Sequence, residues 1–472
     1  MSESSTRYTR VQISHLVLLV IASVLILFAE ASIKELHGTA VFYASLVREI
    51  IDSGNPMLIY TDERAYFIKP PLVLWMSAAF AKIYGLSNFT VTLTSRLAGV
   101  GVVFLTYVLI RRWWSHPIAW LSALAVLTNS TFVQFTATMR MDSLMMFGFL
   151  LSLNGWFYRT AWWSPIALFS GITIAVLSKG PLGFAAIPLI LLHAFLLRTP
   201  VLAKRDWWWA LLLLPILMWF GTLFVFHGFR PFSEFGVDTL RISTMPHLNA
   251  WQSIFDEYLV KPARRYWPWL PFMLVGIFIA CRGIFDRTLD HDSRINYFWL
   301  LIWFAVVFIS SALKPDHDIR YLYPALPVLG FFSALAITTL THDRLPTLIP
   351  GLILFIVVII LIIRYEKPGH IDAANTIEAI RSDIGPSVPL LAIGGYPVRL
   401  DKPRRQNTHR DWVHFYIGAA PKVMSWDQVR KSRPGFDKGV FLTNSRGHVE
   451  RLVEFGLTPK YVTTEMIFAV PK

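Results

Sequence analysis

The chain has 472 residues, of which 54% are hydrophobic and 16% are charged, and its mean hydropathy is +0.50. Soluble globular domains contain about 25% charged residues, so this composition excludes a soluble protein and predicts an integral membrane protein. The formal net charge of +14 is compatible with nucleic-acid binding. However, many of the Lys and Arg residues lie in short loops between apolar segments, where they set orientation across a membrane. We therefore expect no nucleic-acid partner.

Eleven apolar segments are long enough to cross a bilayer. They lie at about residues 13–29, 96–110, 117–137, 143–157, 165–178, 181–197, 207–227, 267–281, 295–313, 321–341 and 347–363. The sequence thus predicts an α-helical polytopic membrane protein with about 11–13 transmembrane helices. Its one cysteine, Cys281, lies in an apolar stretch, which excludes an internal disulfide and a cysteine-based metal site.

The loops predict which side of the membrane each segment faces. Cationic loop residues fall on one side, which the positive-inside rule assigns to the cytoplasm: Arg7, Arg10, Arg111, Arg112, Arg159, Arg198, Lys204, Arg205, Arg282, Arg287, Arg294 and Arg344. With a cytoplasmic N-terminus, an odd number of crossings places the C-terminus outside. The outward segments are then 30–95, 138–142, 179–180, 228–266, 314–320 and everything after 365.

Two segments near the N-terminus allow a second reading. Ala29-Glu30-Ala31 after the first apolar segment resembles a signal-peptide cleavage site. We expect an uncleaved helix, because the following residues make sense as a loop tethered between two spans. Lys69-Pro70-Pro71 opens a helix over about 69–87, with prolines in its first turn. We expect this helix to lie on the membrane surface, since a crossing here would invert every later loop.

The tail has a different composition. In residues 366–472 the apolar runs shorten to strand length, at Val388–Ile393, Val413–Ile417, Gly439–Leu442 and Met466–Val470, with helix-like stretches at Ile371–Ile384 and Val449–Phe455. This alternation predicts a small soluble α/β domain after a membrane domain over 1–365. Its basic tract, from Arg399 to Arg410, is a solvated loop near anionic headgroups or a contact for an anionic lipid acceptor. Gly394-Gly395 is too short a pattern for a nucleotide site.

Six outward motifs occur in the order found in one family of membrane enzymes. They are Tyr43–Ile50 (YASLVREI), Ala65–Leu72 (AYFIKPPL), Ser95-Arg96-Leu97, Arg140-Met141-Asp142, Leu177–Pro181 (LSKGP) and the stretch from Ser310 to Pro324 that includes SSALK and RYLYP. In this respect residues 30–330 resemble the membrane glycosyltransferases of the aminoarabinose-transferase and protein O-mannosyltransferase type. The resemblance implies the fold called GT-C.

The resemblance also implies an activity. Such enzymes move a sugar from a polyprenyl-phosphate donor to an acceptor on the outer face, here lipid A, another glycolipid or a protein. It places the chain in a bacterial inner membrane, with a periplasmic active site and C-terminal domain. The family usually places one or two acids just before the first-loop helix, whereas this sequence reads Glu35-Leu36-His37-Gly38-Thr39-Ala40, with His and Ala near those positions. Ile68 also stands where a Glu often precedes the lysine that corresponds to Lys69. The sequence therefore does not support a divalent-metal site, and it identifies no other cofactor.

The implied reaction needs cations for the leaving phosphate and a base for a hydroxyl acceptor. The expected donor-phosphate ligands are Lys69, Arg140, Lys179, Lys314 and Arg320. The expected catalytic residues are Asp142, Glu35 and His37, and the expected acceptor-binding residues are Arg264, Arg265 and His317. Structural roles compete with these: Lys69 as a snorkelling anchor, Asp142 as a helix N-terminal residue and Lys179 as a turn residue. A phosphate acceptor, already anionic, would need little proton abstraction.

Three further interpretations remain open. Residues 228–266 mix charged and aromatic side chains, which is typical of an amphipathic loop helix, either a moving lid or a static surface element. A transporter or flippase for a lipid-linked sugar would predict internal repeats and charges at the bilayer midplane, whereas the polar residues here cluster at span ends. The missing first-loop acids are also compatible with an inactive binding subunit of an envelope glycan assembly.

Overall fold

The computed structural model describes residues 9–29, 36, 38–57, 59–61, 64–201, 204–233, 255–261, 265–313 and 318–341, together with short pieces of the tail. Those pieces are residues 379, 382, 390–393, 414–416, 422–424, 440–443, 453–454, 457–462 and 467–471. Of the last three predicted spans, the structure describes 295–313 and 321–341, whereas 347–363 lies outside the described residues.

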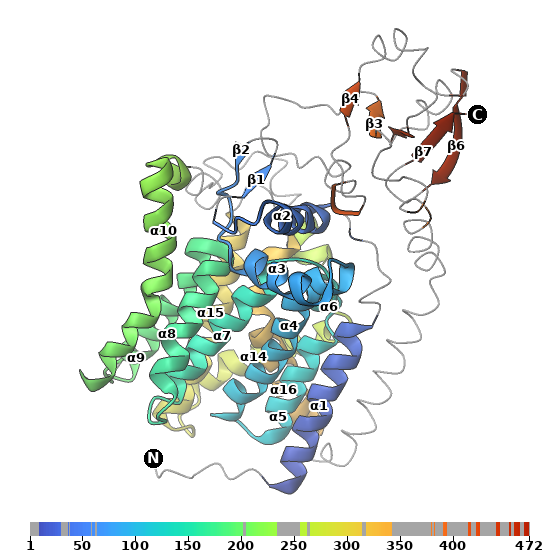
Figure 1. The fold of residues 1–472 in the computed structure, drawn as a ribbon. Helices are drawn as coiled ribbons and strands as arrows, with labels where there is room; N and C mark the ends of the chain where they lie inside the picture. Colours follow the sequence, from blue (N-terminus) through green and yellow to red (C-terminus); the bar gives the residue numbers. More distant parts are fainter. Residues whose placement is uncertain are drawn as a thin grey trace.

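The described part of residues 1–365 is a bundle of helices (Figure 1). The helices of the bundle are, in chain order, α1 (Arg10–Phe28), α4 (Asn88–Arg111), α5 (His116–Leu127), α6 (Ser130–Thr136), α7 (Asp142–Phe157), α8 (Ser164–Lys179), η1 (Gly180–Ala185), α9 (Ala186–Leu196), η2 (Lys204–Leu213), α10 (Leu214–His227), α14 (Leu270–Phe285), α15 (His291–Ala312), η4 (Ile319–Ala325) and α16 (Leu326–Thr341). A short π-helical turn, η3 (Asp256–Val260), precedes α14.

Six described stretches are long and apolar enough to cross a membrane, or up to seven if the bent pair α5 and α6 forms one span. The chain is thus a multi-pass membrane protein. By this criterion, the described residues do not reach the 11–13 spans that we expect from the sequence. One of the six stretches, Ser164–Leu196, includes a reversal. A Cβ on Gly183 would lie 2.3 Å from the backbone of Ala175, which requires η1 to fold back along α8.

One end of the bundle is covered by elements that lie across it. α2 (Thr39–Ser53), α3 (Leu72–Tyr84) and the two-stranded β1 (Tyr60–Thr61) and β2 (Arg64–Ala65) gather there in Figure 1. α3 has 13 residues, ends in an exposed Tyr84 and runs across the bundle axis. It therefore has the surface-lying orientation predicted for residues 69–87. We call this end the loop end.

Arginines collect at the opposite end. α4 ends at Arg111, and Arg112 Nε donates to the carbonyl of Phe157, the last residue of α7, at 3.1 Å. Arg159 follows α7 and lies over the Trp156 ring at 4.9 Å. The structure thus gathers these cations on one side of the bundle, away from the loop end, as the positive-inside reading requires.

Two apolar cores hold the molecule together. The larger runs through the bundle and contains fully buried Trp120, Trp299 and Trp303. The smaller lies at the loop end, between α2, α3 and the first turns of α4 and α7. It also contains Phe415 and Tyr416 from the tail, which are 1% and 4% exposed.

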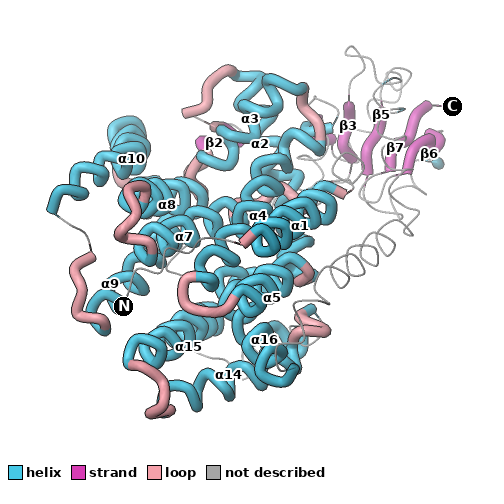
Figure 2. The backbone as a smooth tube through the Cα atoms, turned by 90° about the horizontal axis from the view of Figure 1, so that it is seen from below, coloured by secondary structure: helices cyan, strands magenta, loops and turns pink. Residues whose placement is uncertain are grey.

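The described tail pieces include a five-stranded sheet with strand order β4-β3-β5-β7-β6 (Figure 2). Its strands are β3 (Leu390–Ile393), β4 (Lys422–Met424), β5 (Val440–Thr443), β6 (Leu457–Val462) and β7 (Ile467–Pro471). β3 pairs in parallel with β4 and β5, and β7 pairs antiparallel with β5 and β6. The strand predicted at Val413–Ile417 is wrong, because residues 414–416 are helical and packed on the loop end. Since the predicted helices lie mostly outside the described residues, a separate α/β domain stays a prediction.

Candidate active site

Close packing of α7 against α8 sets the geometry of the site. A Cβ on Gly148 would lie 2.6 Å from the backbone of Ala175, and one on Gly171 would lie 2.5 Å from the Ser152 nitrogen. Small residues of this kind let two membrane helices approach backbone to backbone. Because the helices are antiparallel, the first residue of α7, Asp142, lies beside the last residue of α8, Lys179.

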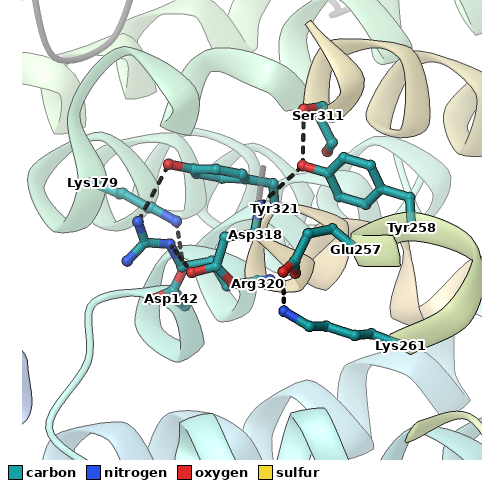
Figure 3. A network of polar contacts seen from close by, with 9 residues as sticks. All are labelled: Asp142, Lys179, Glu257, Tyr258, Lys261, Ser311, Asp318, Arg320 and Tyr321. Carbon is teal, nitrogen blue, oxygen red and sulfur yellow. Dashed lines mark hydrogen bonds and ion pairs between the residues drawn. The ribbon is translucent and has the colours of Figure 1, made fainter. Parts of the chain in front are cut away.

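Asp142 and Lys179 form a buried ion pair at the loop end (Figure 3). Lys179 Nζ donates to Asp142 Oδ1, and the two side chains are only 12% and 7% exposed respectively. Met141 at the N-cap of α7 provides no side-chain cap. Because Asp142 is the first residue of α7, its carboxylate lies near the positive end of the helix dipole. A pair that is desolvated to this degree is stable only if both partners are present.

Arg140 is held in place by the start of α4. Ser95 Oγ donates to the Arg140 carbonyl at 2.8 Å and accepts from the Arg140 nitrogen at 3.2 Å. The next residue, Arg96, is 1% exposed and donates to the carbonyls of Leu27 and Ala137. Those carbonyls belong to the C-terminal ends of α1 and α6, where a cation is favoured. Ser95 and Arg96 therefore fix the turn that carries Arg140 and Asp142.

Arg320 approaches the pair from η4, on the other side of the site. Its guanidinium lies 3.3 Å from Asp318 Oδ2 and donates to the Tyr321 hydroxyl at 3.3 Å (Figure 3). Asp318 also accepts from the Arg320 nitrogen at 2.9 Å, which shapes the turn. The charges of Arg320 and Arg140 both act on Asp142. The cluster thus holds more positive than negative charge.

Tyr43 is a site residue that the sequence analysis did not single out. It projects from α2, is 8% exposed, and lies within electrostatic reach of four charged residues: Lys69, Asp142, Arg140 and Arg320. Burial raises the pKa of its hydroxyl above the usual 10.0, and the charge of Lys69 acts in the opposite direction. At neutral pH this hydroxyl is therefore a hydrogen-bond donor and not a base. Its place in the YASLVREI motif was the one available signal.

The structure brings together five of the predicted residues. Asp142 and Lys179 form the ion pair, and the charges of three others act on it or on Tyr43: Lys69, Arg140 and Arg320. Arg265 contacts α6, where its guanidinium donates to Gln134 Oε1 at 2.8 Å. The remaining predicted residues lie outside the described part of the chain: Glu35, His37, Arg264, Lys314 and His317. Among the residues that are described, no group of three His, Cys, Asp or Glu side chains is placed to hold a metal.

Comparisons of sequence point to one group of enzymes. Residues 68–225 match the family described as dolichyl-phosphate-mannose-protein mannosyltransferase. An undecaprenyl phosphate-alpha-4-amino-4-deoxy-L-arabinose arabinosyl transferase of Shewanella sediminis is 22% identical over 319 residues, which cover 64% of this chain and 56% of that protein. A putative mannosyltransferase of Bacillus subtilis is 31% identical over 138 residues, 28% of this chain and 20% of its own. The aligned part of this chain therefore spans little more than half of the length of the Shewanella enzyme.

Solved structures share the fold. The crystal structure of ArnT from Cupriavidus metallidurans bound to undecaprenyl phosphate aligns with a TM-score of 0.68 at 14% identity, covering 96% of this chain and 97% of that one. The oligosaccharyltransferase AglB of Archaeoglobus fulgidus aligns with a TM-score of 0.55 at 12% identity, covering 98% and 74%. At these identities the likeness shows the fold. The expected resemblance to GT-C membrane glycosyltransferases is confirmed.

Proposed function

We propose that this chain, which has the fold of the GT-C glycosyltransferases, transfers a sugar from an undecaprenyl-phosphate-linked donor to an acceptor at the outer face of a bacterial inner membrane. The observation that carries the proposal is the cluster around Asp142 and Lys179. It lies where helices of the bundle end, it is largely buried, and it has an excess of positive charge. These are the properties needed to hold a lipid-linked phosphate whose tail lies in hydrocarbon.

In the proposed reaction the bond between the sugar C1 and the phosphate oxygen breaks, and the polyprenyl phosphate leaves with the electron pair. Lys69 and Arg320 are the proposed partners of the phosphate, because the charges of both act on Tyr43 and Lys179 and neither is the direct partner of Asp142. Charge-assisted hydrogen bonds of this type strengthen as negative charge builds on the leaving oxygen. Tyr43 would donate a further hydrogen bond.

The acceptor that fits the site best is itself a phosphate, as on lipid A or another glycolipid. Asp142 is the one acid of the predicted catalytic set within the described residues, and it is already paired with Lys179. A carboxylate stabilised by a cation is a weak base. An anionic acceptor oxygen can attack the sugar C1 without losing a proton, so the pairing of Asp142 with Lys179 does not prevent the reaction.

The position of the cluster also separates this proposal from a flippase. Asp142 begins α7 and Lys179 ends α8, so the charged pair lies at helix ends. A flippase of the broken-helix type would place such charges at the bilayer midplane. A binding subunit without catalysis would share this geometry, and an assay separates it from an enzyme.

The test uses the purified protein in nanodiscs with radiolabelled polyprenyl-phosphate sugars and a lipid extract of the host. We expect label in a lipid, and we expect Lys69→Ala to lower kcat/KM by about 10- to 100-fold, as for the loss of a hydrogen bond to a charged group. Lys82→Ala is the matched control, because Lys82 is an exposed lysine of α3. Donor binding without transfer to any acceptor would support the binding subunit, and absence of donor binding would refute the proposal.

A further inference from the structure

The tail reaches back to the loop end and contacts the first-loop helix α2 at two points. The Tyr416 hydroxyl accepts a hydrogen bond from the Leu36 nitrogen at 2.8 Å, just before α2 begins. Arg48, in the third turn of α2, donates from Nη1 to the Phe415 carbonyl at 3.4 Å. The residues joined by the first bond are 380 positions apart in the sequence. In Figure 1 the short orange segment lies beside α2.

These contacts are buried. Phe415 is 1% exposed and Tyr416 is 4% exposed, and both belong to the apolar core that also contains Val41, Phe42 and Tyr43 of α2. Aromatic side chains buried to this degree contribute strongly to packing. The tail segment 414–416 is therefore part of the core under α2.

α2 has little local support of its own at its N-terminus. Gly38 occupies the N-cap position with a φ of 53°, and no side chain caps the first turn. Helix starts without a cap leave backbone N–H groups unsatisfied and are prone to fraying. The bond from Leu36 to Tyr416 fixes the chain two residues before this glycine. A distant segment thus adds to the support that α2 receives from its packing against α3.

We propose that Phe415 and Tyr416 are positioning residues, which hold α2 so that Tyr43 faces the charged cluster at Asp142 and Lys179. This role rests on the proposed function, which supplies the link to the donor. The tail contacts the chain at Leu36, just before α2, and at Arg48 within α2, and the site residue Tyr43 lies between these two points. Loosening of the tail contacts would therefore also move Tyr43. The tail then acts on the site through α2 and does not touch the substrate.

The expected kinetic effect follows from a two-state α2. If releasing the tail leaves α2 in its docked position for only a fraction of the time, the apparent donor affinity falls to that fraction of its original value. Bound donor would favour the docked position again. Tyr416→Phe, which keeps the ring and removes the acceptor oxygen, should raise the donor KM about 3- to 10-fold. We expect kcat to stay within about twofold of its original value. Tyr84→Phe is the control, because Tyr84 is an exposed tyrosine of α3.

A second measurement does not depend on activity. Amide hydrogen exchange, read by mass spectrometry over peptides that cover residues 36–43, should be about 10-fold faster in Tyr416→Phe than in the original protein, and faster still in Tyr416→Ala. Undecaprenyl phosphate should slow exchange in the variants. Unchanged exchange in Tyr416→Ala would overturn the contact itself, and faster exchange with an unchanged KM, or a fall in kcat alone, would overturn the positioning role. If no donor supports turnover, the proposed function fails while the exchange result still decides whether the tail holds α2.

Discussion

A buried ion pair at the end of two helices constrains what each residue can do. Asp142 and Lys179 are both largely excluded from solvent, and each offsets the desolvation of the other. Such a pair adds little net stability compared with apolar residues of similar size, yet removal of one partner is costly. Its presence at the edge of a bilayer, where charge is expensive, therefore favours a functional role over a structural one.

Removing one or both charges of this pair separates its effect on stability from its effect on activity. Lys179→Met removes the direct ion-pair partner of the buried Asp142 carboxylate and should destabilise the fold, by up to about 3–5 kcal/mol. The double variant Asp142→Asn with Lys179→Met removes both charges and should recover most of that loss, while transferase activity stays absent. Thermal unfolding in one detergent measures the first effect, and the labelled-sugar assay measures the second. Lys82→Met, a change at an exposed lysine, is the control. A double variant no more stable than Lys179→Met would show that the pair does not balance charge.

At the scale of elements, glycines decide how closely α7 and α8 approach. Gly148 and Gly171 face the partner helix with no room for a side chain, since an added Cβ would lie within 2.6 Å of backbone atoms in both cases. The crossing therefore sets the lateral distance between the two helices. The ion pair joins their ends, so its geometry depends on residues that carry no charge.

This dependence gives the element-scale prediction. Gly171→Ala should push α8 away from Ser152 and destabilise the protein by about 1–3 kcal/mol, as overpacking does. Alanine is otherwise the better helix former by about 1 kcal/mol, so a net loss measures the clash. Gly221→Ala in α10 is the matched control, because an added Cβ there meets nothing within 4 Å. We expect lower thermal stability and lower transferase activity in the first variant only. Equal stability of the two variants would show that the helices can shift apart freely.

Hydrophobic periodicity and length predict the bundle helices well, because each is a single apolar run with charges at its ends. α7 and α8 begin and end within one residue of the predicted spans 143–157 and 165–178. The failures have a different cause. Val413–Ile417 reads as a strand because it is short, apolar and β-branched, but a tertiary contact with α2 holds residues 414–416 in a helical turn. A tertiary contact also explains why the sequence did not reveal Tyr43 as a site residue. Its place near the charged cluster depends on how α2 packs against the bundle.

At the scale of the whole molecule, one group of loop arginines and the buried charged cluster lie at opposite ends of the bundle. The described arginines at the ends of α4, α7 and α14 lie on one side of the bundle, and the site with its covering helices α2 and α3 lies on the other. Loop arginines are retained in the cytoplasm during insertion. We therefore expect the site to face outward, where the proposed lipid acceptor would reach it.

The last prediction tests this orientation directly. In a Cys281→Ser background, Asn55→Cys and Arg287→Cys each place one thiol at an exposed position, the first after α2 at the loop end and the second between α14 and α15. We expect a membrane-impermeant maleimide to label Asn55→Cys in intact spheroplasts, and to label Arg287→Cys only after permeabilisation. The physical reason is the cost of moving the clustered arginines across the hydrocarbon, which fixes their end of the bundle inside. The reverse labelling pattern would place the charged cluster in the cytoplasm, where a donor displayed on the outer leaflet could not reach it.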